Sequence, residues 1–295
     1  MAIAWPRAVS VLGGAGLAGS AGWTVYAWRA SKRVDCSETV VTVPSLPPGL
    51  DGLRVLHVAD THFPANGESL ERFLAAARRQ RYDIVIGTGD YVDTAAGWDV
   101  ALRAFAALEP GLGVFAVIAG HDRAAASRRD SLLRVLGRTR RAQIDPAPFV
   151  AGLRAAGVRV LINEHTAVEI GGELVRFIGV DDAYHGLDRL TEALPAGDAD
   201  GFPILLSHSP DGLLDPAARG LPLAFSGHTH GGQIRLPGYG APMRHARSVG
   251  RRQAAGVVRI GDAQVVISRG FGTTSVPLRF ACSPELGVVE IRAAP

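Results

Sequence analysis

Cysteine and lysine are scarce in this chain of 295 residues, which contains two cysteines, Cys36 and Cys282, and a single lysine, Lys32. Two cysteines are too few for a disulfide-stabilised scaffold. They also lack the CxxC spacing of a thiolate metal site, so we expect two unpaired thiols. The formal net charge is only +3, and no dense basic stripe interleaved with aromatic residues is present. Both features argue against a nucleic-acid partner.

The composition excludes a chain dominated by disorder, because 47% of the residues are hydrophobic and 20% are charged. A chain of this length can bury a substantial core, and its simplest organisation is one large domain with an appendage. The small positive charge suits an anionic substrate or an anionic membrane surface.

The appendage is the N-terminal segment, in which residues 8–28 carry no charged side chain. A helix of this length can cross the hydrocarbon core of a bilayer. Aromatic side chains lie toward its ends, as they do at membrane interfaces: Trp5, Trp23, Tyr26 and Trp28. We expect residues 1–33 to be an uncleaved transmembrane signal anchor. A cleaved signal peptide stays open, since small residues at 18–20 suit a signal peptidase, and a buried globular helix is disfavoured by the glycine content.

Residues 34–52 are polar and rich in proline, and they form either a linker or an extended edge segment. Residues 53–295 have the pattern of one folded domain, in which strands and helices first alternate. Strands are predicted near 53–59, 83–87 and 114–118, and helices near 68–80 and 98–108. A basic insertion at 123–145 interrupts the alternation.

The second half of the domain is richer in strands. It begins with a helix near 148–156, and Gly171-Gly172 is typical of a hairpin turn. Strands are predicted near 158–162, 166–170, 173–180, 203–207, 222–226, 256–260, 263–268 and 287–292. We therefore predict an α/β fold, a four-layer αββα sandwich in which helices flank two packed mixed β-sheets.

Histidine and aspartate residues recur where the predicted strands end. The segments VLHVADTH, IVIGTGDYVD, VFAVIAGHD, ILLSHSP and LAFSGHTH each pass from an apolar run into turn residues with imidazole or carboxylate groups. These residues are Asp60, His62, Asp90, His121, His208, His228 and His230. An α/β protein gathers its site at the carboxyl ends of strands, so we expect these side chains to converge there.

The spacing of these residues points to metal binding. Asp60 and His62 are two positions apart, so on an extended segment both side chains face the same way and can bind one ion. His228 and His230 repeat this arrangement. Asp90 follows a glycine that lets the backbone approach closely, and its carboxylate could bridge two cations. Mixed imidazole and carboxylate ligands suit Mn, Fe or Zn.

The order of the blocks resembles the calcineurin-like metallophosphoesterase family, whose pattern is DxH, GDxxD, GNHD, a His in an (S/A)HxP context, and GHTH. Four of the five blocks match as they stand. The similarity covers residues 38–293, and the tail GHTHGGQIRLP, SRGFGTT and PLRFACSPEL resembles a bacterial membrane-associated branch. The resemblance implies a bacterial cell membrane location. The charges flanking residues 8–28 do not settle the membrane side, and the extracytoplasmic side is preferred.

The resemblance also implies the role of each site residue. One divalent cation would be held by Asp60, His62, Asp90 and His230, and the other by Asp90, His208 and His228, with Asp90 shared. The two cations, Mn, Fe or Zn, would share a hydroxide that attacks phosphorus in line. His121 would protonate or stabilise the leaving-group oxygen, and Asp60 or Asp122 is the candidate partner that keeps His121 charged.

Gly120 departs from this pattern, because the family has an Asn there that is a ligand of the second metal. Three interpretations are open. A water or another side chain completes the second site, the second metal is bound weakly and exchanges, or the protein has lost catalysis. We favour an active enzyme with a weakened second site, since His121 and the other ligands are present. The alternative is a catalytically impaired metal-binding protein of the same fold.

Several further residues have ordinary structural explanations. His57 is expected to be a core histidine, and Asp93 a turn or hydrogen-bond acceptor rather than a ligand. Asp181 and Asp182 could face the site or cap a turn. The histidines without pattern support, expected at the surface, are His165, His185 and His245.

Arginine residues are the candidates for substrate contact. Arg123 and Arg235 are singled out, while Arg269 and Arg279 are explained equally well by phosphate binding and by packing or salt bridges. The insertion at 123–145 is either a basic flap that contacts anionic headgroups or substrate phosphate, or an ordinary solvated insertion.

We predict an enzyme that hydrolyses phosphodiester, phosphomonoester or pyrophosphate bonds, in a substrate that is a lipid or envelope precursor. A nucleic-acid phosphodiesterase is disfavoured by the anchor and the modest basicity. The sequence leaves the exact substrate and the oligomeric state open.

Overall fold

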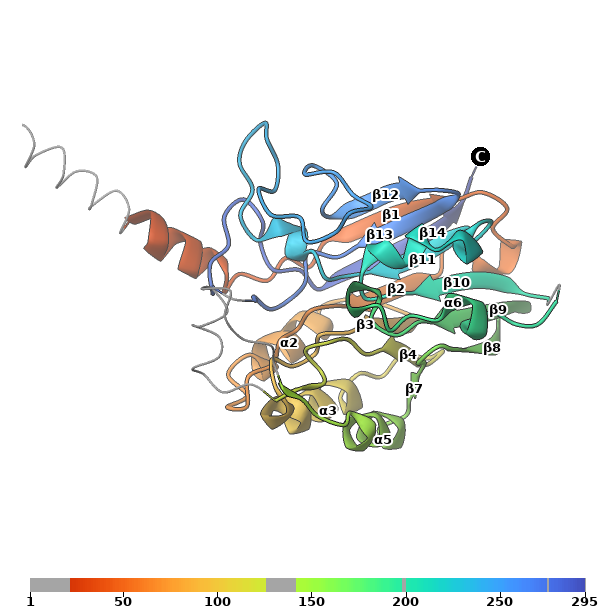
Figure 1. Cartoon of the computed structure of the whole chain (residues 1–295), viewed down its shortest axis with the longest axis horizontal. Helices are drawn as coiled ribbons and strands as arrows, with labels where there is room; N and C mark the ends of the chain where they lie inside the picture. The colour runs from red at the N-terminus through yellow and green to blue at the C-terminus, as the bar shows by residue number, and fades with distance from the viewer. Residues whose placement is uncertain (1–21, 126–141, 198–199, 275, 295) are drawn as a thin grey trace, which may run out of the picture.

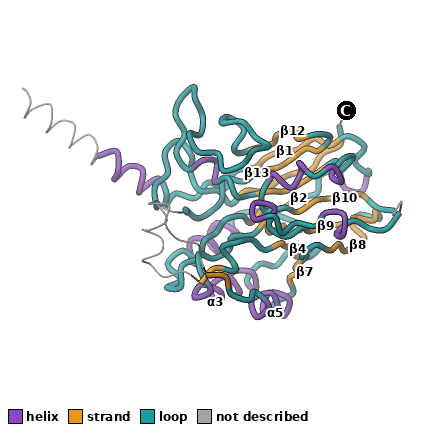
Figure 2. Tube along the Cα trace, viewed as in Figure 1, coloured by secondary structure: helices purple, strands orange, loops and turns teal. Residues whose placement is uncertain are grey.

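The structure is a computed structural model that describes residues 22–125, 142–197, 200–274 and 276–294. Two six-stranded sheets pack face to face, with helices on their outer faces (Figure 1). Figure 2 shows the same arrangement as strands in the middle of the molecule and helices toward its outside. The predicted αββα sandwich is therefore confirmed.

The first sheet is mixed. Its strands lie in the order β1 (Glu38–Val43), β14 (Gly287–Ala293), β2 (Arg54–Val58), β3 (Ile84–Thr88), β4 (Val114–Val117) and β7 (Val158–Val160). β2, β3, β4 and β7 run parallel, β14 runs antiparallel to β2, and β1 pairs in parallel with β14. The segment 34–52, for which a linker and an edge segment were both open, thus contains the edge strand of this sheet.

The second sheet has a parallel centre with an antiparallel strand at each edge. Its order is β12 (Gly256–Ile260), β13 (Ala263–Ile267), β11 (Leu223–Ser226), β10 (Phe202–Leu206), β9 (Glu173–Gly179) and β8 (Glu164–Ile170). Gly171 and Gly172 connect β8 to β9 with φ angles of 60° and 80°, so the predicted hairpin turn is confirmed. This left-handed conformation costs glycine little because glycine has no Cβ.

Helices cover the outer faces unequally. The first sheet is covered by α2 (Leu70–Ala77), α3 (Trp98–Ala106) and α5 (Ala147–Ala155). The second sheet carries the short α6 (Leu190–Ala193) and the 3-10 helices η4 (Pro210–Leu214) and η5 (Pro216–Ala218). The remaining 3-10 helices are η1 (Pro48–Leu50), η2 (Ala95–Gly97), η3 (Ala183–His185) and η6 (His230–Gly232).

The alternation of side chains along each strand divides the apolar residues between separate cores. In β4, Val114 and Ala116 face the helices, whereas Phe115 and Val117 face the second sheet. The ring of Phe115 stacks on that of Phe177 from β9, with centroids 3.9 Å apart. This contact joins the two sheets, and their packing brings the ends of their central strands together.

The N-terminal segment is described from residue 22, and residues 22–30 are helical. The Ala27 carbonyl accepts a hydrogen bond from the Arg279 backbone N–H at 3.0 Å, and the rings of Trp23 and Tyr26 lie 5.9 Å from that of Phe280. Among the described residues, no helix has the length and apolar character needed to cross a membrane. Residues 1–21 of the predicted anchor lie outside the described part.

The basic insertion is described only at its two ends. These ends pair as the short strands β5 (Ala124–Ala125) and β6 (Ala142–Gln143). Residues 126–141, which carry the predicted flap, lie outside the described residues.

Replacing Phe177 by alanine should remove the aromatic contact between the sheets. The residue is fully buried, so we expect a loss of about 3–5 kcal/mol in the free energy of unfolding. Urea unfolding measures this change. Leu174→Ala in the same strand is the control, because Leu174 is 41% exposed and should change stability little. Equal effects of the two substitutions would contradict the assignment of a core between the sheets.

Candidate metal centre

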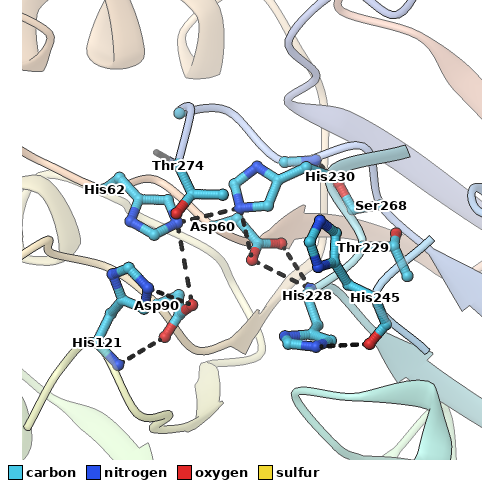
Figure 3. Close-up of polar contacts among 12 residues, drawn as sticks. Asp60, His62, Asp90, His121, His228, Thr229, His230, His245, Ser268 and Thr274 are labelled. Carbon is cyan, nitrogen blue, oxygen red and sulfur yellow. Dashed lines mark hydrogen bonds and ion pairs between the residues drawn. The ribbon is translucent and has the colours of Figure 1, made fainter. Parts of the chain in front are cut away.

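The predicted site residues all lie just beyond the carboxyl ends of parallel strands. Asp60 and His62 follow β2, Asp90 follows β3, His121 follows β4, His208 follows β10, and His228 and His230 follow β11. Because these strands run parallel within each sheet, their carboxyl ends share one edge. Figure 3 shows the side chains from both sheets pointing toward one another at this edge.

The backbone at the site is left-handed at five of these residues. The φ angles are 48° at Asp60, 44° at His62, 54° at Asp90, 68° at His228 and 50° at His230. Residues other than glycine rarely adopt this conformation, and it persists only where surrounding contacts hold it. Some of those contacts link the turns after β2 and β3, since Asp60 N–H donates to the Gly89 carbonyl and His62 N–H to the Asp90 carbonyl, both at 3.1 Å. Such strain is typical of a functional site.

The first group of possible metal ligands is Asp60, His62 and His230. Each offers a ligand atom, these atoms all lie within 4.8 Å of one another, and all three residues are buried. The two Nε2 atoms of His62 and His230 are 3.1 Å apart, and His230 Nε2 is 3.5 Å from Asp60 Oδ1. The three side chains can therefore reach one ion.

The second group is Asp60, Asp90 and His208, again within 4.8 Å. Asp90 Oδ2 lies 3.3 Å from His208 Nε2 and 3.9 Å from His62 Nε2, so its carboxylate faces ligand atoms of both groups. His228 joins this group through its Nδ1, which is 3.1 Å from His208 Nε2. Asp90 thus has the position that a bridging ligand requires.

The donor set fits a divalent cation. Two pairs of imidazole nitrogens face each other at 3.1 Å, an arrangement that needs a proton or a cation between lone pairs. Burial raises the pKa of Asp60 to about 6 and lowers the pKa of His228 to about 4. Keeping the Asp60 carboxylate charged is therefore costly without a compensating cation. Imidazole nitrogens and carboxylate oxygens together suit Mn, Fe or Zn.

Three of the imidazoles are oriented through the nitrogen that faces away from the cluster. His62 Nδ1 contacts Asp93 Oδ1 at 3.0 Å, and His208 Nδ1 donates to the Thr88 carbonyl at 2.8 Å. His228 Nε2 donates to the His245 carbonyl at 3.0 Å, as Figure 3 shows. Hydrogen bonds of this kind fix the tautomer and the orientation of a metal-binding histidine. Asp93 is accordingly an acceptor behind the cluster.

The structure places the carboxylate of Asp93 beside His121. His121 Nδ1 contacts Asp93 Oδ1 at 3.2 Å, whereas the sequence favoured Asp60 or Asp122. Asp122 is fully buried, and its carboxylate accepts four backbone N–H groups: those of Asp90 at 3.0 Å, Tyr91 at 2.7 Å, Val92 at 3.2 Å and Ala119 at 3.0 Å. Asp122 therefore holds the turns after β3 and β4 together and positions Asp90. The Asp60 carboxylate accepts from the backbone of His228 instead, at 3.0 and 3.1 Å.

The candidate substrate arginines are engaged with the protein itself. Arg123 Nη2 pairs with Asp181 Oδ1 at 2.5 Å, and Arg235 donates to the carbonyls of Gly231 and Arg252. Arg269 pairs with Asp35 and Glu285. Ion pairs and hydrogen bonds within the protein account for these side chains.

Arg279 has a structural function that sequence reasoning left open. It is fully buried and donates to the carbonyls of His230 at 3.1 Å and Gly270 at 3.0 Å, and to that of Gly272. The guanidinium thereby fixes the turn that carries His230 against the turn after β13. Only its place in the block PLRFACSPEL marked it in the sequence.

The other histidines divide between core and site. His57 is 2% exposed, contacts Thr88 Oγ1 at 3.1 Å and packs edge-on against Phe225, so the predicted core histidine is confirmed. His185 and His245 are exposed, so the expectation that they lie at the surface is confirmed for both. Both also lie next to the cluster. The carbonyl of His245 orients His228, and the imidazole of His185 lies beside Gly120. Neither position follows from local sequence, because both depend on which loops meet.

The cysteines are both unpaired, as expected. Cys282 is buried, and its thiol lies 3.3 Å from the His230 carbonyl.

Residues 53–232 match the calcineurin-like phosphoesterase family, and this range contains all the predicted metal ligands. The metallophosphoesterase YkuE of Bacillus subtilis (strain 168) is 25% identical over 273 residues, which cover 88% of this chain and 86% of YkuE. The phosphodiesterase YaeI of Escherichia coli (strain K12) is 26% identical over 242 residues, covering 81% of this chain and 82% of YaeI. Among solved structures, the sulfate thiohydrolase SoxB aligns with a TM-score of 0.41 at 14% identity, over 77% of this chain and 53% of SoxB.

Gly227→Ala should weaken metal binding, because a Cβ at this position would collide with Asp60 Oδ2. Displacing a ligand or its supports typically costs about 10–100-fold in metal affinity. Isothermal titration with Mn²⁺ measures the loss. Gly111→Ala is the matched control, since its Cβ would enter open space. If Gly227→Ala binds Mn²⁺ as tightly as the control, Asp60 is not a ligand.

Proposed function

The chain belongs to the calcineurin-like phosphoesterase family, and on that premise we propose that its strand-end cluster hydrolyses phosphodiester, phosphomonoester or pyrophosphate bonds at a centre of two divalent cations. The observation that carries this proposal is the position of Asp90, whose carboxylate lies between two groups of buried ligand atoms. A single shared carboxylate is what two adjacent cations require.

We assign the ligands from this geometry. Asp60, His62, Asp90 and His230 would hold one cation, and Asp90, His208 and His228 the other. When bound, the pair supplies Lewis-acid chemistry and activates water for attack at phosphorus. The protein contributes an oriented set of donors, held by Asp93, Thr88, His245 and Asp122 through the hydrogen bonds described above.

His121 is the proton donor in this proposal. Its Nδ1 contacts the Asp93 carboxylate, a contact that favours the charged imidazolium, and its Nε2 lies 4.0 Å from Asp90 Oδ2. The Nε2 proton is therefore held at the edge of the cluster, where it can be passed to the oxygen of a departing alcohol or phosphate. The side chain is 18% exposed, so a substrate can reach it from solvent.

His121→Ala should lower kcat by about 10²–10⁴-fold, because proton transfer by a positioned side chain contributes about that much. Hydrolysis of bis(p-nitrophenyl) phosphate with added Mn²⁺ measures the change. Metal content should stay at the wild-type level, and His165→Ala is the control, since its ring bonds the Ala193 carbonyl away from the cluster. Wild-type turnover no higher than that of His121→Ala would favour the alternative, a metal-binding protein of the same fold without catalysis.

We further propose that the substrate is a lipid or envelope precursor and that residues 1–33 anchor the chain in a bacterial membrane. Support comes from the uncharged residues 8–28. It also comes from relatives of Danio rerio and Bos taurus named as transmembrane proteins with a metallophosphoesterase domain, each 25% identical to this chain. An anchored enzyme meets lipid-linked phosphoesters at the surface where they reside.

Leu12→Arg/Leu17→Arg should release the protein from membranes, because each arginine makes insertion of an apolar helix unfavourable by several kcal/mol. Fractionation of expressing cells, followed by carbonate extraction, tests this. The mass of the membrane-bound wild type separates the two interpretations of the segment. A mature chain that begins near residue 21 would contradict an anchor and support a cleaved signal peptide.

A further inference from the structure

The space beside Gly120 is occupied by the imidazole of His185. A Cβ at position 120 would lie 2.6 Å from His185 Cε1, 2.9 Å from His185 Nδ1 and 3.0 Å from Asp182 Oδ2. Contacts below 3.0 Å force a shift, so a side chain at 120 would displace the imidazole of His185 from its present position. The absence of a side chain at 120 therefore leaves room for the imidazole of His185 in this position.

His185 is held by a buried carboxylate. Asp182 Oδ2 contacts His185 Nδ1 at 2.7 Å and accepts the Gly120 backbone N–H at 2.7 Å, while Oδ1 accepts the Tyr184 N–H at 2.9 Å at the start of η3. Asp182 itself is 1% exposed, whereas the His185 side chain is 51% exposed. A carboxylate on Nδ1 fixes the tautomer that leaves the lone pair on Nε2, which is the arrangement of a metal-binding histidine and its supporting carboxylate.

The neighbours of His185 adjoin the second ligand group. Gly120 immediately precedes His121, whose backbone N–H donates to Asp90 Oδ1 at 3.0 Å. On the other side, the ring of Tyr184 lies 4.5 Å from that of His228. The hydrogen bond to Asp182 raises the pKa of His185 most, Asp90 raises it further, and His208 lowers it. His185 therefore lies near enough to Asp90 and His208 to interact electrostatically with both.

We propose that His185 supplies, through Nε2, the ligand of the second cation that Gly120 cannot provide, with Asp182 as its positioning residue. The second site is then completed by Asp90, His208, His228 and His185. This inference rests on the proposed two-cation centre. It also changes the chemistry of the second site, because an imidazole nitrogen in place of an amide oxygen shifts metal preference from Mn²⁺ toward Zn²⁺.

The test measures metal bound per chain in the detergent-solubilised full-length protein, by equilibrium dialysis against Zn²⁺ and, separately, Mn²⁺. Wild type should bind two ions. His185→Ala should keep one ion with unchanged affinity and bind the second about 10–100-fold more weakly. His165→Ala is the matched control and should behave as wild type. Electron paramagnetic resonance of the Mn²⁺ form gives an independent readout, since the signal of two coupled ions should disappear in His185→Ala.

A swap of the two positions sharpens the test. Gly120→Asn/His185→Ala places an amide oxygen where the imidazole stood and should restore the second ion, with Mn²⁺ bound better relative to Zn²⁺ than in wild type. Gly120→Asn alone forces the new side chain against His185, so we expect it to bind the second ion no better than wild type. Equal thermal midpoints in excess chelator establish that the variants are folded.

The outcomes separate this inference from the proposed function. If wild type and His185→Ala bind the same number of ions with the same affinities, His185 is not a ligand and the inference is overturned, while the metal centre stands. If wild type binds no ion, the proposed function itself fails. The inference is established if His185→Ala loses the second ion and the double variant binds it again. His185 then takes the place of a side-chain ligand at position 120.

Discussion

The candidate metal centre depends on the buried carboxylate of Asp122. It accepts four backbone N–H groups from the turns after β3 and β4, and so fixes Asp90 and His121 relative to each other. A carboxylate that satisfies this many donors in a dry environment is costly to replace, because each donor would be left unpaired. Asp122 thereby holds the turn that carries Asp90, the carboxylate that the two proposed cations would share.

The residues around Asp122 carry two destabilising features, which are backbone strain and the burial of polar groups. Five of the cluster residues have left-handed backbone conformations, and imidazoles and carboxylates crowd within hydrogen-bonding distance in a buried space. Contacts in the surrounding fold stabilise this arrangement. The two apolar cores keep the sheets in place, and the buried Arg279 ties the His230 turn to the turn after β13. Rigid support of this kind is what a preorganised site needs.

In the proposed second site, a distant side chain takes the place of the ligand that position 120 lacks. Gly120 and His185 are 65 positions apart in sequence, and they meet because β4 and β9 place their following loops at the same edge of the sandwich. Asp182 then joins the two loops through the Gly120 N–H and the His185 ring. The sequence pattern marked Gly120 as a defect. In three dimensions, the space beside the glycine holds the imidazole of His185.

The sequence by itself determined the strands, their helices and the residues of the cluster, because burial periodicity and strand-end motifs are local properties that each segment carries alone. Only the tertiary structure decided which hydrogen-bond and ion-pair partners the site residues have. Asp93 contacts His121, and the exposed His185 lies beside Gly120. Arg123 and Arg235 bind the protein's own carboxylate and carbonyl groups. These contacts join loops that are remote in sequence, and the packing of the two sheets determines them. They therefore cannot be predicted from the local sequence pattern.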